Sequence, residues 1–177
     1  MRTARALSAA AVAGLLLASP VAAQMDHDDA SVEGVRNLYT TVKGFLVASA
    51  EQASADLYAY RPTEEVRSFG EILGHVANAG YLFCGAAAGM ERPQLPNAEE
   101  FTAKADIVAA VKAMFEFCDR AHQIDGTRAA EAITFFNQDH TRLSVLAFNM
   151  GHNFEHYGNL VTYMRINGMV PPSSQGG

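Results

Sequence analysis

The chain has 177 residues, of which 49% are hydrophobic and 18% are charged, and its 13 basic and 19 acidic side chains give a formal net charge of −6. This composition is typical of a globular protein and argues against long disordered stretches. An acidic chain without a basic run repels phosphate backbones, so nucleic-acid binding is not expected.

Residues 1–23 have the pattern of a secretory signal peptide. Arg2 and Arg5 supply positive charge, an apolar run covers residues 9–18, and small residues up to Ala23 suit a cleavage after that position. The alternative is a membrane anchor. The run is well short of the roughly 20 apolar residues that a spanning helix needs, so we favour the signal peptide.

Cleavage at this position would leave one exported domain. Two basic residues and no acidic ones would be removed, so the remaining chain has 11 basic and 19 acidic residues and a net charge of −8. A domain of roughly 150 residues can bury a sizeable core. Because no second apolar stretch could span a bilayer, we expect a periplasmic or extracellular protein without membrane contact.

Four segments repeat apolar side chains at steps of three and four, which predicts amphipathic helices. They cover approximately residues 31–54, 68–88, 103–124 and 139–167. Ser68 and Glu71 match a capping box at the start of the second helix. Asp125 and Gly126 end the third helix, and Gly168 ends the fourth.

The remaining segments have weaker patterns. Residues 24–30 form a polar lead-in that we expect to be flexible, and residues 171–177 form a disordered tail. Residues 129–137 fit either a short strand-like segment or irregular structure. Since no segment alternates with period two for long enough to build a sheet, residues 31–170 predict an all-α domain, a four-helix bundle.

His152 and His156 lie four residues apart on the fourth predicted helix. That spacing corresponds to about 40° of rotation and about 6 Å of rise, so both rings leave the same face of the helix. Two imidazoles in this arrangement can chelate one metal ion. Taken alone, the pair is explained more simply as two ordinary core or surface histidines.

His75 adds weight to the metal interpretation. It shares a face of the second helix with Ile72, Ala79 and Leu82, and we expect that face to point inward. A single histidine there is more often a hydrogen-bonded core residue. Two inward histidine faces in one bundle can nevertheless converge. Three imidazoles would leave a fourth coordination position for water or substrate.

The other histidines are not expected to be metal ligands. His27 lies in the polar lead-in, and His140 begins the fourth predicted helix. His122 lies near the end of the third helix, where a positive ring would suit the helix dipole.

Residues 152–156 also match the H-x-x-E-H spacing of one class of metallopeptidase, in which the glutamate activates water. On a helix, Glu155 lies about 80° from the midpoint of the two histidines. We therefore expect it to flank the site, either solvated or hydrogen-bonded to a ligand ring. Peptidase chemistry is not favoured.

Cys84 and Cys118 are the only cysteines. In an exported protein, an even cysteine count favours a disulfide over two separate buried thiols. The two residues lie about 16 and 15 residues into the second and third predicted helices, so they reach the same height only if those helices are parallel. A bridge would therefore require a crossover connection between them.

Two stretches are similar to motifs of a known family. Residues 69–76 (FGEILGHV) and residues 152–172 (HNFEHYGNLVTYMRINGMVPP) resemble the second-helix and fourth-helix motifs of the DinB-like (YfiT-like) metalloprotein superfamily. The resemblance implies a four-helix bundle of up-down-down-up order. It also implies one divalent ion, nickel or zinc, on His75, His152 and His156.

Some members of that family are thiol-dependent transferases or isomerases, and many have no assigned reaction. Export removes a protein from the cytoplasmic pool of small thiols, which argues against carrying that activity over. We expect a metal-dependent hydrolase or transferase that acts on a small molecule. The alternative is a non-catalytic metal-binding or interaction protein. A deep cavity beside the free coordination position would favour the enzyme.

Four polar side chains are candidates for orienting a substrate or a ligand ring: Asn78, Asn149, Glu155 and Tyr163. Taken alone, each is explained more simply as an ordinary hydrogen-bonded interior group. Gly151 and Gly158 mark the fourth helix as a place where another helix could approach closely, which would allow a homodimer.

Overall fold

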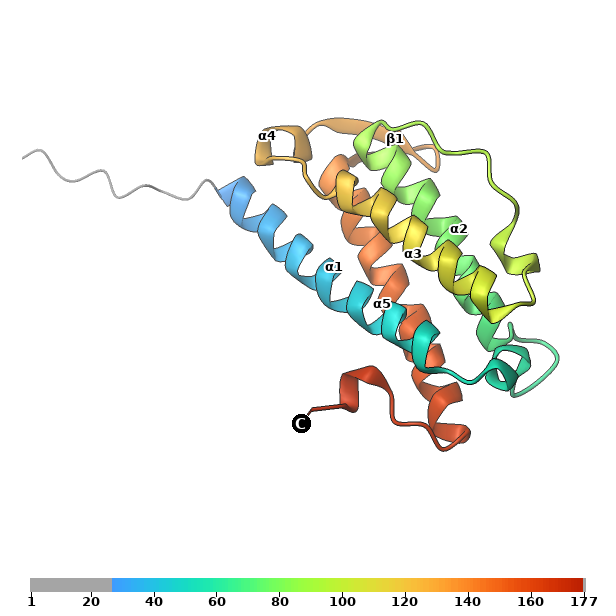
Figure 1. Cartoon of the computed structure of the whole chain (residues 1–177). Coiled ribbons are helices and arrows are strands. Elements are labelled where there is room, and N and C mark those ends of the chain that lie inside the picture. Colours follow the sequence, from blue (N-terminus) through green and yellow to red (C-terminus); the bar gives the residue numbers. More distant parts are fainter. Residues whose placement is uncertain (1–26, 177) are drawn as a thin grey trace, which may run out of the picture.

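The computed structural model describes residues 27–176, which are mainly helical (Figure 1). The long helices are α1 (His27–Gln52), α2 (Phe69–Ala88), α3 (Lys104–Ala121) and α5 (Arg142–Ile166). Among the described residues, no helix is long and apolar enough to cross a membrane. The predicted signal peptide, residues 1–23, lies outside the described part of the chain.

The four long helices form a bundle with the expected order of directions. In Figure 1, α2 and α3 run the same way, whereas α1 and α5 run the opposite way. Helix α2 packs against both α3 and α5, and α1 packs against the same two helices. The connection after α2 returns along the length of the bundle before α3 begins. The predicted all-α fold and its up-down-down-up topology are therefore confirmed.

Local capping signals set the ends of these helices. At the start of α2, the Glu71 amide donates to Ser68 Oγ at 3.2 Å, and the Ser68 amide donates to Glu71 Oε2 at 2.7 Å. This is the predicted capping box. Gly89 ends α2 with φ of 68°, a left-handed conformation that costs glycine little. Thr141 forms a second capping box with Ser144, which the sequence analysis did not identify.

A β-hairpin precedes α5. Strands β1 (Ala132–Phe135) and β2 (Gln138–Thr141) pair antiparallel, and Phe136 and Asn137 form the turn with φ of 49° and 61°. The fourth helix therefore begins at Arg142, three residues after the predicted start, and His140 lies on β2 instead of the helix. Of the ambiguous segment 129–137, the strand-like alternative is correct for residues 132–135, and Phe136 and Asn137 form the turn.

Both ends of the predicted domain are longer than expected. Helix α1 begins at His27, and Asp29 from the predicted lead-in accepts a hydrogen bond from the Gly126 amide at 3.0 Å. The predicted disordered tail contains a short 3₁₀ helix, η3 (Pro172–Ser174). The Ser173 amide donates to the Tyr157 hydroxyl at 2.8 Å, which anchors this segment against the bundle.

A disulfide joins the two parallel helices. Cys84 on α2 and Cys118 on α3 are bonded, with their Cα atoms 5.3 Å apart, and both side chains are fully buried. The bond is consistent with the crossover topology, since both cysteines lie at the same height in the bundle. It also points to an oxidising environment for the protein.

His122 is buried at the end of α3. The sequence analysis expected a positively charged ring at this position, but the ring is neutral. Its ring stacks on Tyr39 with centroids 3.7 Å apart and is 3% exposed. Burial, followed by the nearby charge of Arg36, lowers the pKa of His122 to about 4. The positive charge at this helix end comes from Arg36, whose Nε donates to the His122 carbonyl at 2.9 Å.

Because the pKa of the buried His122 ring is lowered, we expect the folded chain to lose stability in mild acid. The pKa is about 4 in the folded chain and about 6.5 in the unfolded chain. Between these values only the unfolded chain takes up the proton, so stability falls as pH drops below 6.5. By pH 5 the loss from this group is about 2 kcal/mol.

Urea unfolding of chelator-treated protein at pH 7.5 and pH 5 measures the effect. The His122→Phe variant keeps a ring against Tyr39 but cannot titrate, so it should lose about 2 kcal/mol less than the wild type. Equal losses in the two proteins would contradict the assignment.

Candidate metal centre

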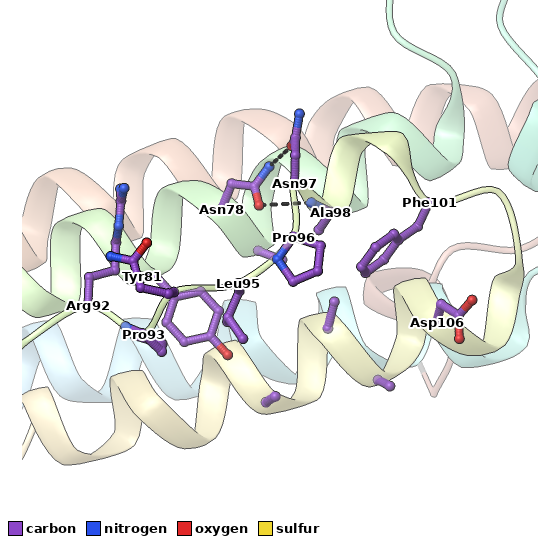
Figure 2. Close-up of a pocket in the computed structure, with 15 residues that line it drawn as sticks. Asn78, Tyr81, Arg92, Pro93, Leu95, Pro96, Asn97, Ala98, Phe101 and Asp106 are labelled. Carbon is purple, nitrogen blue, oxygen red and sulfur yellow. Dashed lines mark hydrogen bonds between the residues drawn. The ribbon is translucent and has the colours of Figure 1, made fainter.

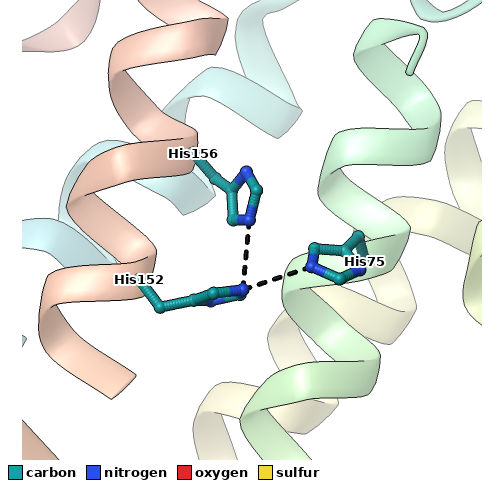
Figure 3. Close-up of side chains that lie close together, drawn as sticks. All are labelled: His75, His152 and His156. Atoms are coloured by element: carbon teal, nitrogen blue, oxygen red, sulfur yellow. Dashed lines mark hydrogen bonds between the residues drawn. The ribbon is translucent and has the colours of Figure 1, made fainter. Parts of the chain in front are cut away.

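Three histidines from two helices meet at the contact between α2 and α5. His75 comes from α2, and His152 and His156 come from successive turns of α5 (Figure 3). The Nε2 atom of His152 lies 3.2 Å from Nε2 of His75 and 3.1 Å from Nε2 of His156. The structure thus brings the three predicted ligands together, and below we call them the histidine triad.

The spacing of these nitrogens fits a shared divalent ion. Each imidazole nitrogen has either one proton or one lone pair, so His152 Nε2 cannot make a good hydrogen bond to both neighbours. A tetrahedral ion with bonds of about 2.0–2.1 Å holds its ligand nitrogens about 3.3 Å apart. Among the described residues, no other histidine, cysteine or carboxylate joins the cluster. The triad is therefore compatible with metal binding and leaves coordination positions free of protein ligands.

Glu99 fixes the orientation of one triad ring. His75 Nδ1 donates to Glu99 Oε1 at 2.9 Å, and Arg67 Nε donates to Glu99 Oε2 at 2.9 Å. Burial opposes ionisation of Glu99, but the hydrogen bonds from His75 and Arg67 outweigh it and lower the pKa of the carboxyl. Because the proton of His75 is then on Nδ1, the Nε2 lone pair faces the other two rings. A carboxylate behind a ligating histidine is a common feature of metal sites.

The other two rings are held neutral by their surroundings. Burial, followed by the neighbouring His75, lowers the pKa of His152. Burial, followed by His152 and His75, lowers the pKa of His156 to about 4. Neutral imidazole is the form that ligates a metal, so both rings are ready to bind at neutral pH.

The triad lies at the edge of the bundle and not in its centre. The side chain of His75 is 25% exposed, and Leu82 on the same face of α2 is 36% exposed. The predicted inward face of α2 is therefore only partly inward, since His75 and Leu82 on it remain partly exposed to solvent. The exposed side of His75 leaves part of the triad open to solvent.

An aromatic cluster lies beside the triad on the side of the hairpin. It consists of Phe83, Phe135, Phe136 and Phe148. The Phe83 ring lies 5.5 Å from the His152 ring, 5.3 Å from Phe148 and 5.4 Å from Phe135 (centroid distances). Phe136 and Phe148 are 62% and 55% exposed, which is unusual for phenylalanine. The surface that leads to the triad is thus apolar and accessible.

Three of the predicted polar candidates are hydrogen-bonded elsewhere. Asn78 donates to Asn97 Oδ1 at 2.6 Å and accepts from the Ala98 amide at 3.1 Å, so it secures the connection before α3. Asn149 is fully buried and donates to Cys84 Sγ at 3.4 Å. The Tyr163 hydroxyl donates to the Arg67 carbonyl at 3.0 Å, so its link to the triad is indirect.

Glu155 is exposed, and its carboxylate makes no hydrogen bond to another described residue. The carboxylate that bonds a triad ring is Glu99 instead, which the sequence analysis missed. Glu99 lies 24 residues after His75, on the short 3₁₀ helix η2 (Ala98–Glu100) within the connection between α2 and α3. Only the folded path of that connection brings it back to α2. Gly151 and Gly158 are exposed, with no neighbouring atom within 4 Å of an added Cβ, so a homodimer through α5 stays a prediction.

Substitution of Glu99 is expected to change the metal affinity of the triad measurably, because Glu99 accepts the hydrogen bond from His75. Glu99→Ala removes the acceptor that orients His75, and we expect an affinity about 10- to 100-fold lower for nickel or zinc. Glu99→Gln keeps an acceptor and should lose less. The matched control is Glu155→Ala, which removes an exposed carboxylate next to His156 in sequence. Competition against a metal-sensitive dye measures the metal affinity of all three variants. Equal losses of affinity in Glu99→Ala and Glu155→Ala would contradict the orienting role of Glu99.

Comparison with known proteins gives consistent matches. Residues 40–160 match the family model of the DinB superfamily. The chain is 26% identical over 120 residues to the uncharacterized protein YjoA of Bacillus subtilis (strain 168), an alignment that covers 66% of this chain and 77% of YjoA.

Two solved structures have a similar fold. A DinB-like protein from Bacillus cereus ATCC 10987 has a TM-score of 0.70 at 13% identity and covers 79% of this chain and 95% of its own. The YjoA structure has a TM-score of 0.64 at 20% identity, and the match covers 81% of this chain and 99% of YjoA. At these identities the two structures support the shared fold alone.

Proposed function

The chain belongs to the DinB superfamily, and on that basis we propose that it is an enzyme that uses one divalent metal ion on the histidine triad. The reaction is hydrolysis or group transfer on a small molecule. The observation that carries this proposal is the convergence of three Nε2 atoms, with His152 Nε2 within 3.2 Å of the other two.

Three imidazole ligands are the donor set of a catalytic site, because structural sites usually complete the coordination with a fourth protein ligand. A divalent ion held in this way polarises a carbonyl or phosphoryl group and activates water. The chain's own contribution is to hold the donors in place. Glu99 and Arg67 orient His75, and burial keeps His152 and His156 neutral. Imidazole donors accept both nickel and zinc.

The aromatic cluster supports a substrate with an apolar group. Phe83 contacts the His152 ring, and Phe148 extends the apolar surface outward from it. A phenyl or similar group would stack there while the bond to be cleaved lies at the triad. The cluster offers no charged side chain, so a highly charged substrate is disfavoured.

A second candidate is a non-catalytic metal-binding protein. The observation that favours it is the place of a cavity of about 590 Å³, which lies under residues 92–98 and has none of the triad histidines in its lining. Enzyme sites are usually concave and enclose much of their substrate. An enzyme here would have to bind its substrate over the exposed side of His75 and the aromatic cluster.

Activity measurements on nickel-loaded, zinc-loaded and chelator-treated protein separate the two candidates. Suitable substrates are aryl and alkyl esters, amides and phosphoesters. The enzyme proposal predicts turnover that requires the metal, is lost in His152→Ala and favours aryl substrates. In Phe148→Ala the preference for aryl substrates should fall, while Leu38→Ala, an exposed apolar control on α1, should leave it unchanged. Stoichiometric metal binding with no metal-dependent turnover of any of these substrates would favour the binding protein.

A further inference from the structure

A second potential binding site lies on the opposite side of α2 from α5. The cavity of about 590 Å³ is bounded by α2, α3 and the connection between them (Figure 2). Alanines form the helical walls, and Pro93, Leu95 and Pro96 of the connection lie between the two helices. The volume is within the range of small-molecule pockets in proteins, about 300–1,000 Å³.

The connection over this cavity is fixed mainly at its two ends. The Met90 amide donates to the Gly85 carbonyl at 2.9 Å, and Asn97 is held by Asn78. Within the described part of the chain, residues 91–96 make no hydrogen bond or ion pair, and Leu95 is 55% exposed. A segment with so few polar contacts can adjust to a ligand at little cost.

Tyr81 supplies a polar group without a partner. Its side chain is 9% exposed and lines the cavity, yet its hydroxyl makes no hydrogen bond within the described residues. Figure 2 shows this hydroxyl directed from α2 toward α3. Burial, followed by Glu116, raises the pKa of Tyr81, so the hydroxyl keeps its proton and can donate it to a ligand. The hydroxyl oxygen stays accessible to solvent, so a ligand acceptor at this edge of the cavity would replace water as its partner.

The lining suggests a neutral ligand. Arg92 and Asp106 contribute opposite charges to it. The rest of the lining is uncharged and consists of alanine, proline, leucine and aromatic side chains together with three amides, Asn78, Gln94 and Asn97. Neither sign of charge is favoured, and flat apolar surfaces on both sides suit a ring system.

The same connection leads directly to the histidine triad. Asn97 and Ala98 line the cavity, and the next residue is Glu99, whose carboxylate accepts the hydrogen bond from His75 Nδ1 at 2.9 Å. Asn78 holds Asn97 and the Ala98 amide, so it connects α2 to the same segment. A ligand that packs against residues 92–98 would therefore restrict the movement of Glu99 at His75.

We propose that this cavity binds a small neutral aromatic molecule with a hydrogen-bond acceptor, and that its occupancy strengthens metal binding at the triad through residues 97–99. The site itself is independent of the proposed function, whereas the link to the triad rests on it. By thermodynamic linkage, bound metal strengthens binding of the aromatic molecule by the same factor.

The site is tested with prodan, a neutral naphthalene ketone whose fluorescence reports an apolar environment, in chelator-treated full-length protein. We expect saturable binding of one prodan per chain. Ala109→Trp fills the cavity and should weaken binding at least tenfold, while Ala105→Trp, on the same helix outside the cavity, should not. Tyr81→Phe removes the donor and should weaken binding about fivefold. Absence of saturable binding, or equal affinity in Ala109→Trp and the wild type, would overturn the site.

The link is tested by nickel titration with and without saturating prodan. We expect a three- to tenfold higher nickel affinity with prodan, an equal factor in the reverse titration, and no effect of prodan in Ala109→Trp. Prodan binding without any change in nickel affinity would overturn the link and leave the site. If nickel does not bind the wild type while prodan does, the proposed function and the link both fail, and the site still stands.

Discussion

Replacing His152 with alanine is expected to lower the affinity for nickel or zinc by about 100-fold or more. The Nε2 atom of His152 lies 3.2 Å and 3.1 Å from the Nε2 atoms of His75 and His156, so it is the ligand that connects the other two. Structural zinc sites with four ligands bind with about 10–16 kcal/mol, which corresponds to roughly 3 kcal/mol for each ligand. The loss of one histidine should therefore cost at least two orders of magnitude.

Isothermal titration calorimetry with each metal measures this change in affinity. His140→Ala is the matched control. His140 lies on β2, and its ring is 6.3 Å from that of Phe135, outside the triad. The control should bind like the wild type. Circular dichroism in chelator should show a folded bundle in both variants, because His152 lies at the partly exposed edge of α5. Unchanged affinity in His152→Ala would mean that other residues hold the metal.

Replacing both cysteines with alanine is expected to lower the free energy of unfolding by about 4 kcal/mol. The disulfide joins residues separated by 34 positions, and a loop of that length loses considerable entropy in the unfolded chain when it is closed. The variant also loses the buried contact between Asn149 Nδ2 and Cys84 Sγ at 3.4 Å. Because domains of this size are stable by only about 5–15 kcal/mol, the change removes a large share of the total.

Urea unfolding in oxidising and reducing buffers measures this contribution. Wild-type protein refolded in reductant should approach the double variant Cys84→Ala/Cys118→Ala, whose own stability should not depend on the reductant. If the wild type is equally stable in both buffers, the bond does not contribute to stability as argued. The double variant is preferred to a single one because an unpaired buried thiol would confuse the comparison.

Features of the fold that depend on short stretches of sequence were predictable. The Ser68–Glu71 capping box and the Gly168 helix end use residues within a few positions of each other, and the structure has both. The predicted stop at Asp125 and Gly126 is wrong, because α3 ends at Ala121 and Asp125 caps the short helix α4 (Gly126–Ala129). The pairing of Cys84 with Cys118 was expected from the even cysteine count of an exported chain, and it required the parallel helices that the structure has. Local spacing also placed His152 and His156 on one face of α5.

The hairpin before α5 was predictable only in part. Its strands have four residues each, and β2 is polar throughout, so neither has enough alternation to stand out. The turn residues Phe136 and Asn137 are not the Asn-Gly pair that usually marks such a turn. Tertiary packing of Phe135 against Phe83 on α2 therefore helps to hold a segment with a weak local signal.

Glu99 and the cavity under residues 92–98 could not be predicted, for a common reason. Both depend on the path of the connection between α2 and α3, which contains little secondary structure. That path is set by the Asn78–Asn97 hydrogen bond and by the return of the chain along α2, neither of which leaves a pattern in the sequence. The same connection supplies the carboxylate that orients His75.

The most direct test of a metal ion on the triad is anomalous X-ray scattering from a crystal of the nickel-loaded protein, recorded on both sides of the nickel absorption edge. The account predicts one nickel peak per chain, within about 2.2 Å of the Nε2 atoms of His75, His152 and His156. A peak at any other position, or no peak at the triad in crystals soaked with nickel, would contradict it.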